Sequence, residues 1–227
     1  MPKILVVEDE QHIAEGLKFN LDCEGFETTI CSNAEDATGK YTDFDMLILD
    51  IMLPGMNGLD FLRQIRKENP QYPVLILSAK TSEESLVEGL SAGADDYIKK
   101  PFSLAELILR VNRILERQAW YVEQTAKEQE FSFGDYRINF STFEARTNDG
   151  DVLLTQYECF VMKYLIDNMD RSVSREELLK TVWGYSYTPE TRTVDNFIAR
   201  LRKMFEEDRK SPTHIRSIRG VGYRFYS

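Results

Sequence analysis

The sequence predicts an α/β unit with a doubly wound, five-stranded parallel sheet, followed by a smaller α+β unit. The first prediction rests on short, nearly continuous apolar runs, each followed by a stretch of helical periodicity. The second rests on a change of pattern after residue 131, where short alternating strands precede helical stretches and a hairpin. We therefore expect one domain at residues 1–117, a polar linker at 118–130 and a second domain at 131–227.

The strands and helices of the first unit alternate along the chain in a βα repeat. The strands are expected at residues 4–7, 26–30, 46–49, 74–77 and 97–98. The helices are expected at residues 11–23, 34–41, 58–67, 82–92 and 103–117. Turn-forming pairs such as Glu24-Gly25 and Pro54-Gly55 separate them. A repeat of this kind places helices on both faces of a parallel sheet.

The second unit begins with four alternating strands and ends with a hairpin. The strands are expected at residues 131–133, 136–140, 144–147 and 152–154, and the helices at 156–168, 175–182 and 191–207. Thr155 and Ser174 are expected as helix N-caps, because a Glu follows each of them at the third helical position. The closing hairpin is expected at residues 215–226, with its turn at Gly220-Val221-Gly222.

Composition narrows the class of protein. No apolar run approaches the roughly 18 residues that a membrane span needs. The three cysteines show no metal-binding or redox spacing, which favours a reducing, cytoplasmic location. Charge is uneven: residues 1–117 hold 12 Lys and Arg against 21 Asp and Glu, whereas residues 191–227 hold nine against four. An acidic first unit and a basic C-terminal segment indicate two domains with different partners.

Polar side chains follow four of the five predicted strands. In an open parallel sheet, ligands bind beyond the carboxyl ends of the strands, so these side chains are expected to meet at one edge. They are Glu8 and Asp9, Asp50, Ser78, and Lys100. A single Asp at a strand end is most often a cap or a turn former, but this ordered set favours a functional site.

The set has the chemistry of a phosphoryl-transfer site. Clustered carboxylates are tolerable beside Mg²⁺, which prefers oxygen ligands; we expect Asp9, Asp50 and the backbone carbonyl of Met52 as ligands, with Glu8 acting through water. Lys100 and Ser78 suit the oxygens of a phosphoryl group carried on Asp50.

The motifs VVEDE, LILDIMLPGMNGLDFL, LSAK and GADDYIKKPF resemble the receiver domain of bacterial response regulators, which has a flavodoxin-like fold. The resemblance covers residues 3–117. It implies that Asp50 accepts a phosphoryl group from a sensor histidine kinase, with Glu8 and Asp9 as the acidic pair and Lys100 as the active-site lysine. Lys100 would precede Pro101 in a cis peptide bond, and Ser78 and Tyr97 would be the switch residues.

The same resemblance implies a homodimer in the phosphorylated state, through the face made by the fourth helix, fifth strand and fifth helix. Matching positions pair Asp96 with Arg110 and Asp95 with Arg117 across two chains. A third family pair joins Glu106 to a basic residue at position 86, where this chain has Leu86.

The second unit reads as a winged helix-turn-helix. In residues 191–207 the apolar side chains at 194, 197, 198, 201 and 205 mark a buried stripe. The polar side chains expected on the opposite face, facing the major groove of double-stranded promoter DNA, are Arg192, Thr193, Asn196, Arg200 and Lys203. Arg219, beside the glycine turn, is expected on the wing, where it would enter a minor groove.

The motifs LTQYECFVMKYLIDN, VSREELLKTVWGY, TRTVDNFIARLRK and IRSIRGVGYRF resemble the effector domain of the OmpR/PhoB family. The resemblance implies that 191–207 is the recognition helix and that 183–190 faces RNA polymerase. Many relatives have His where Phe197 stands and Arg where Ala199 stands. We expect Trp183 to be a core or loop anchor rather than a DNA contact.

The expected protein is a cytoplasmic response regulator that catalyses only phosphotransfer to its own Asp50 and the hydrolysis of that group. One alternative is a Mg²⁺-dependent phosphatase with a nucleophilic Asp. Such enzymes usually need a second Asp two residues later, where this chain has Met52. The other alternative is a DNA-binding protein that does not depend on phosphorylation.

Overall fold

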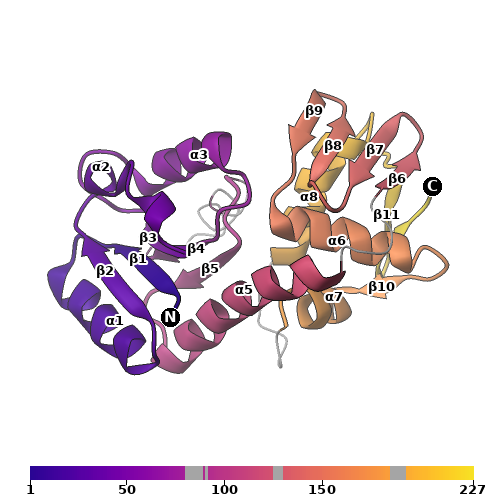
Figure 1. Ribbon diagram of the computed structural model, residues 1–227. Coiled ribbons are helices and arrows are strands. Elements are labelled where there is room, and N and C mark those ends of the chain that lie inside the picture. The colour runs from indigo at the N-terminus through magenta and orange to yellow at the C-terminus, as the bar shows by residue number, and fades with distance from the viewer. Residues whose placement is uncertain (80–88, 90–91, 125–129, 185–192) are drawn as a thin grey trace. The chain divides into compact units, whose positions relative to one another are not determined.

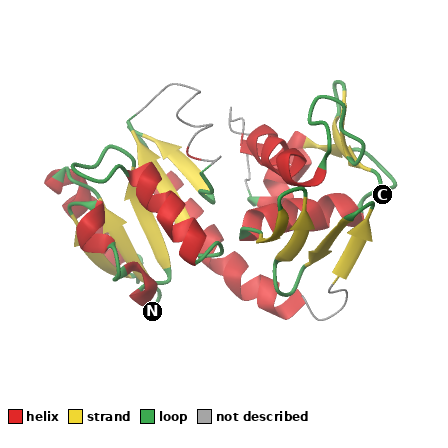
Figure 2. Ribbon diagram, turned by 90° about the horizontal axis from the view of Figure 1, so that it is seen from above, coloured by secondary structure: helices red, strands yellow, loops and turns green. Residues whose placement is uncertain are grey.

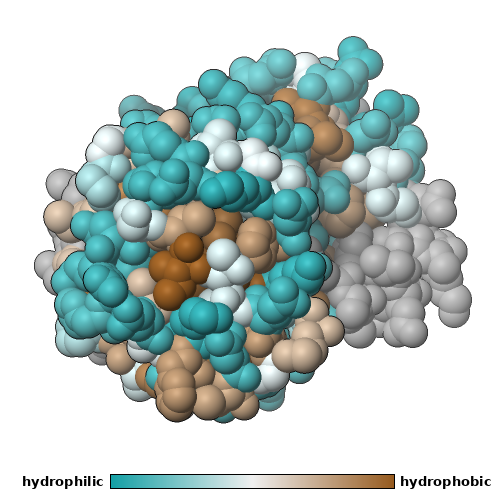
Figure 3. Space-filling view, turned by 60° about the vertical axis from the view of Figure 1, so that its left-hand side comes forward, coloured by the Kyte–Doolittle hydropathy of each residue, from teal (hydrophilic) through white to brown (hydrophobic). Residues whose placement is uncertain are grey.

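The computed structural model describes residues 1–79, 89, 92–124, 130–184 and 193–227, and the side chains of 117–124 are not considered. The chain divides into two compact units, residues 1–119 and 120–227 (Figure 1). Hydrophilic residues cover most of the face drawn in Figure 3, around a hydrophobic patch near its centre. Within the described residues, no helix is both long enough and apolar enough to cross a membrane.

The first unit contains the predicted five-stranded parallel sheet. Its strands are β1 (Lys3–Val7), β2 (Glu27–Cys31), β3 (Met46–Asp50), β4 (Val74–Ser78) and β5 (Asp96–Lys99). Their order is β2-β1-β3-β4-β5, and every neighbouring pair is parallel. All residues of β3 and β4 are buried, as expected for strands covered on both faces. The predicted fold class is therefore confirmed.

Helices cover both faces of this sheet. They are α1 (Gln11–Cys23), α2 (Ala34–Ala37), α3 (Gly58–Glu68) and α5 (Leu104–Gln124), with a 3-10 turn at Tyr41–Asp43. Figure 1 shows α1 and α5 on one face and α2 and α3 on the other. The helix expected at 82–92 falls almost entirely outside the described residues. The fifth helix runs to Gln124, so it extends past residue 117 into the segment expected as a linker.

The described residues of the second unit form two antiparallel sheets and three helices. Figure 2 shows their arrangement. The first sheet is β6 (Glu130–Phe133), β7 (Tyr136–Asn139), β8 (Glu144–Thr147) and β9 (Gly150–Leu153). The helices are α6 (Gln156–Asp167), α7 (Arg175–Val182) and α8 (Thr193–Phe205). The second sheet has the order β10-β12-β11, from β10 (Val173–Ser174), β11 (Ile215–Ile218) and β12 (Gly222–Phe225). The two-residue strand β10 was not predicted.

Side-chain caps fix the starts of two helices in this unit. Thr155 and Glu158 form a full capping box at the start of α6, with the Thr155 amide donating to the Glu158 carboxylate over 2.7 Å. Ser174 caps α7 by accepting from the Glu177 amide at 3.0 Å. The Glu177 carboxylate instead accepts from Tyr164 and Arg171. The cap of α6 is therefore as predicted. For α7, Ser174 caps the helix as predicted, but the Glu177 side chain does not complete the capping box.

The core of the second unit is rich in aromatic side chains. Trp183 is buried and stacks on Tyr157, with ring centroids 5.5 Å apart, while Phe197 packs edge-on at 5.0 Å. This confirms that Trp183 is a core residue. Phe197, which stands where the resemblance implies His in many relatives, belongs to the same core.

Candidate functional site

Four of the predicted site residues meet at one edge of the parallel sheet. Glu8 follows β1, Asp50 ends β3, Ser78 ends β4 and Lys100 follows β5. These strands are adjacent and parallel, so their carboxyl ends lie together. Glu8, Asp50 and Ser78 are buried. The sequence prediction that strand ends would bring these groups together is confirmed.

Lys100 joins the two buried carboxylates. Its Nζ lies 2.5 Å from Asp50 Oδ2 and 2.7 Å from Glu8 Oε2. Burial alone would lower the pKa of Lys100, but its hydrogen bonds to Asp50 and Glu8 raise that pKa above the ordinary value. The lysine is therefore a fixed positive charge beside Asp50. The Lys100-Pro101 peptide bond is cis, as the resemblance implied.

The carboxylates have the spacing of a cation site. One oxygen from each of Glu8, Asp9 and Asp50 lies within 4.8 Å of the others. Burial raises the pKa of Glu8 to about 7, against the lowering effect of its hydrogen bond to Lys100, and the nearby charge of Asp50 adds to the rise. Three carboxyl groups thus gather around Lys100. Oxygen donors of this kind fit Mg²⁺.

The loop after β3 wraps around Asp50. The Met52 amide donates to Asp50 Oδ1 over 2.8 Å, while the Met52 side chain is exposed. Gly58, the first residue of α3, packs against the same segment: a Cβ at Gly58 would lie 2.1 Å from the Asp50 carbonyl oxygen. The sequence predicts Gly58 as the first residue of a helix at 58–67, with no particular contact. A close backbone approach of this kind has no signal in a single sequence beyond the glycine itself.

Ser78 and Tyr97, the two residues expected to act as a switch, contact each other. Tyr97 is buried on β5, next to β4, whose last residue is Ser78. Burial raises the pKa of the Tyr97 phenol, whereas a hydrogen bond from Ser78 lowers it by less. The tyrosine side chain is therefore turned inward, toward the strand that ends in Ser78.

The charged residues expected at a dimer interface are paired within the chain. Arg110 Nη1 lies 2.6 Å from Asp96 Oδ2, and Arg110 Nη2 lies 2.6 Å from Glu106 Oε1. The sequence analysis expected Arg110 and Asp96 to pair across two chains. Arg117 and Leu86 lie outside the part of the chain whose side chains are described.

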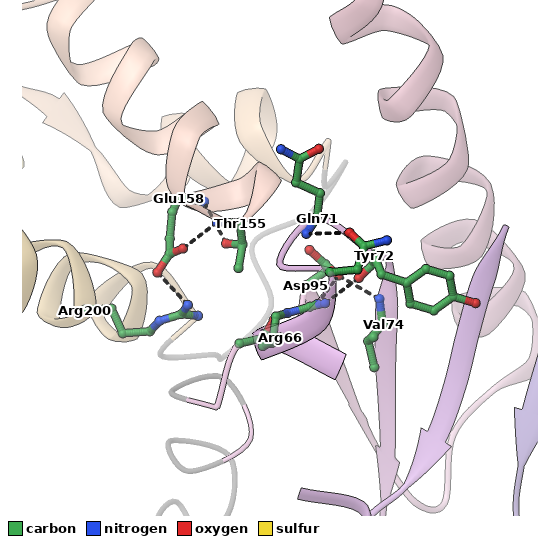
Figure 4. A network of polar contacts seen from close by, with 10 residues as sticks. Arg66, Gln71, Tyr72, Val74, Asp95, Thr155, Glu158 and Arg200 are labelled. Carbon is green, nitrogen blue, oxygen red and sulfur yellow. Dashed lines mark hydrogen bonds and ion pairs between the residues drawn. The ribbon is translucent and has the colours of Figure 1, made fainter. Parts of the chain in front are cut away.

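Asp95 is held by Arg66, a residue that the sequence analysis did not single out. Arg66 Nη2 lies 2.9 Å from Asp95 Oδ2, which also accepts from the Val74 amide at 2.7 Å (Figure 4). Arg66 further donates to the carbonyls of Tyr72 and Gly93. Both charged side chains are almost fully buried, so Asp95 has an internal partner in Arg66.

The exposed face of α8 differs from the predicted one. Thr193 and Asn196 are buried, so they do not lie on the exposed face of α8 where the sequence placed them. Arg200 pairs with the buried carboxylate of Glu158 at 2.5 Å (Figure 4). The positive charge of Arg200 therefore offsets the negative charge of Glu158 in the capping box of α6, and Arg200 is directed toward α6 and not toward solvent. The cause is that α8 packs against both α6 and α7, which leaves it a narrow exposed strip.

Two of the predicted DNA contacts are exposed. Lys203 lies on the strip of α8 that includes Ala199, and Arg219 lies in the turn between β11 and β12. Arg192 lies outside the described residues. The placement of Arg219 on a hairpin turn is as the glycine pattern indicated.

Two family descriptions match the chain. Residues 4–112 match "Response regulator receiver domain", and residues 149–225 match "Transcriptional regulatory protein, C terminal". The chain is similar to the sensory transduction protein RegX3 of Mycolicibacterium smegmatis, with 36% identity over 226 residues and 99% of each chain covered.

Solved structures are similar over the full length. Response regulator DrrB, described as a Thermotoga maritima OmpR/PhoB homologue, is 34% identical, with 100% of both chains covered and a TM-score of 0.53. A mutant of RitR is 24% identical, with 100% of this chain and 99% of that chain covered and a TM-score of 0.79. The RitR likeness shows the fold alone.

Proposed function

The chain belongs to the OmpR/PhoB family of response regulators, and we propose that phosphorylation of Asp50 by a sensor histidine kinase controls its binding to promoter DNA. The receiver and DNA-binding domains identify a two-component regulator of transcription rather than a classical enzyme. The observation that carries the proposal is the contact of Lys100 with Asp50 in a buried, acidic strand-end site.

The residues around Asp50 suit acceptance of a phosphoryl group. An Asp50 carboxylate oxygen forms the new bond to phosphorus while the bond from phosphorus to the kinase histidine nitrogen breaks. Lys100 and the Ser78 hydroxyl then donate to phosphoryl oxygens. The Met52 amide holds the loop after β3 close to Asp50. Glu8, Asp9, Asp50 and the Met52 carbonyl would hold Mg²⁺, which supplies positive charge against the phosphoryl group.

The signal passes from Ser78 to the face that includes β5 and α5. A phosphoryl group on Asp50 adds charge and acceptor oxygens, which draw Ser78 toward them. Tyr97 is already turned inward in this structure, which is compatible with that state. Phosphorylation then favours a homodimer through this face, with Asp96 and Arg110 as its charged centre.

The second unit, residues 131–227, binds double-stranded promoter DNA. Lys203 from α8 and Arg219 from the wing are its exposed contacts. Arg192, which lies outside the described residues, is proposed as a contact from the sequence alone. In the dimer, two recognition helices lie about one DNA turn apart. The segment 183–190 meets RNA polymerase. A cytoplasmic location suits these partners and the three free cysteines, Cys23, Cys31 and Cys159.

Two measurements test the proposal together: the molecular mass in solution, which reports dimerisation, and the affinity for promoter DNA. The wild-type chain and Asp50→Ala are compared with Mg²⁺, with and without acetyl phosphate or beryllofluoride. Asp60→Ala removes an exposed carboxylate from α3 of the same unit and is the matched control. Wild type and control should dimerise and bind promoter DNA more tightly with the phosphoryl donor, whereas Asp50→Ala should not respond. Equal binding by all three under both conditions would identify a DNA-binding protein that is independent of phosphorylation.

A further inference from the structure

Glu206 connects the end of the recognition helix to the first strand of the wing. It follows directly after α8, and its side chain is only 2% exposed. Oε1 accepts from the amides of His214 at 2.9 Å and Ile215 at 2.5 Å. Oε2 accepts from both the amide and the hydroxyl of Thr213, at 2.6 and 3.0 Å. One buried carboxylate therefore holds the three residues at which the chain enters β11.

No lysine or arginine forms an ion pair with Glu206 in the described part of the chain. Its charge is instead balanced by backbone N–H groups, which are strong, fixed donors when they surround a carboxylate. Losing these bonds would leave buried polar groups without partners, which is costly. The arrangement is therefore rigid, and it depends on the carboxylate itself.

Arg202, one helical turn earlier on α8, holds the same point of the wing. Its Nε and Nη2 donate to the Ile215 carbonyl at 2.9 and 2.7 Å, and Nη2 donates to Ser217 Oγ at 2.9 Å. Both backbone groups of Ile215 are thus bound by side chains of the recognition-helix segment. Because β11 is an edge strand, these groups would otherwise be unpaired.

The consequence concerns the spacing of the two exposed basic residues. Lys203 lies on α8 between Arg202 and Glu206, and Arg219 lies in the turn at the far end of β11. Fixing the start of β11 to α8 fixes the wing turn relative to the helix. A protein that contacts DNA through both elements binds more tightly when their spacing is set before binding.

We propose that Glu206, supported by Arg202, is a positioning residue that sets the wing against the recognition helix, so that Lys203 and Arg219 contact DNA together. This inference rests on the proposed DNA-binding function. It assigns Glu206 no contact with DNA, because the carboxylate is buried and its oxygens are occupied.

Glu206→Gln tests the inference, with Glu207→Gln as its matched control. Glu207 is the exposed neighbour and the substitution makes the same change of charge. Loss of a negative charge alone should leave DNA binding equal or stronger. An amide at 206 still has one carbonyl oxygen, but its NH₂ group faces backbone donors. Glu206→Gln should therefore weaken binding, against the electrostatic direction, whereas Glu207→Gln should not.

The readout is the salt dependence of affinity for a duplex that the beryllofluoride-treated wild-type chain selects from a random-sequence library. Log K, where K is the association constant for DNA, decreases linearly with the logarithm of salt concentration. If the wing leaves the DNA, this slope should become shallower by about 0.9, as for one lost phosphate contact. Arg219→Ala should then weaken binding by about fivefold or more in the wild-type background and by less than about twofold in Glu206→Gln. A purely structural loss of stability would change neither the slope nor this coupling.

Arg202→Lys is the second variant, because it keeps the charge and the exposed surface but loses the planar pair of donors. If Glu206→Gln fails to fold, as judged by circular dichroism, Arg202→Lys should show the same reduced coupling to Arg219. An unchanged slope together with an equal effect of Arg219→Ala in all backgrounds would overturn the inference while leaving the proposed function intact. If the wild-type chain selects no duplex, the proposed function fails and the inference fails with it.

Discussion

Arg110 and Asp96 form a buried ion pair within one chain, with Nη1 and Oδ2 2.6 Å apart. The same guanidinium also binds Glu106, one helical turn away on α5. A dimer that uses Arg110 across its two-fold axis must therefore compete with two intrachain partners. The family resemblance implies a basic residue at position 86 opposite Glu106, where this chain has leucine. We therefore expect Glu106 to compete with a partner chain for Arg110.

Removing Glu106 should therefore strengthen dimerisation, whereas removing Asp96 should weaken it. Glu106→Gln removes one of the two intrachain partners of Arg110. It should lower the dimer dissociation constant of the beryllofluoride-treated chain, by up to about fivefold for a pair worth up to about 1 kcal/mol. Asp96→Asn removes the proposed partner across the interface and should raise that constant. Sedimentation equilibrium measures both, with Glu27→Gln on β2 as the charge-matched control. A change in the same direction for both variants would contradict this view of Arg110.

Asp95→Asn should act on stability rather than on association. Asp95 and Arg66 are a buried pair, and breaking such a pair costs about 3 kcal/mol or more because one charge loses its partner. Asp60→Asn, which disturbs the exposed pair with Arg63, should cost under about 1 kcal/mol. Urea unfolding of the full chain measures both. If Asp95→Asn unfolds like wild type but no longer dimerises, Asp95 serves the interface and not the α3–β5 contact.

The grouping of the residues around Asp50 could be predicted from sequence because it depends on strand ends. Parallel strands bring Glu8, Asp50 and Lys100 to one edge whatever the details of packing. The pairing of Asp95 could not be predicted in this way. Arg66 lies 29 positions earlier on α3, and nothing in its sequence context separates it from an exposed helical arginine.

The exposed face of α8 could not be predicted from sequence for a different reason. A helix with one neighbour has one apolar stripe, and its polar residues face solvent. Because α8 packs against more than one element, polar residues such as Asn196 and Arg200 also turn inward. The partner of Arg200 is Glu158, a capping residue 42 positions earlier. Which polar residues of a doubly packed helix stay exposed depends on such distant partners.

The ion pair between Arg171 and Glu177 should make the free energy of unfolding depend on pH in the acid range. The hydrogen bond from Arg171 lowers the pKa of Glu177 to about 2 in the folded chain, from an ordinary value of 4.5. The ionised carboxylate therefore stabilises the fold at pH above about 4.5, and this contribution is lost as the pH falls toward 2. The difference in unfolding free energy between wild type and Glu177→Gln should shrink over that window.

The control for this pH dependence is Glu176→Gln, which changes the exposed neighbour in the same turn of α7. Its difference from wild type should vary little with pH. Urea unfolding at pH 6, 4 and 3 gives both curves. A constant difference for Glu177→Gln over this range would show that the carboxylate is not held by Arg171 in solution.

Gly58→Ala should disable the phosphorylation site without touching any of its charged groups. A Cβ at Gly58 would lie 2.1 Å from the Asp50 carbonyl oxygen and 2.9 Å from Ile51 Cα, so the end of β3 must move. Because Asp50 must stay aligned with Lys100, whose Nζ is 2.5 Å from its carboxylate, we expect labelling by radioactive acetyl phosphate to fall by about tenfold or more. Gly16→Ala on α1 is the control: a Cβ there meets nothing within 4 Å, and alanine should stabilise the helix by about 0.5–1 kcal/mol. If Gly58→Ala is labelled as fast as wild type and Gly16→Ala, then the segment after β3 tolerates displacement and the alignment of Asp50 with Lys100 does not limit the reaction.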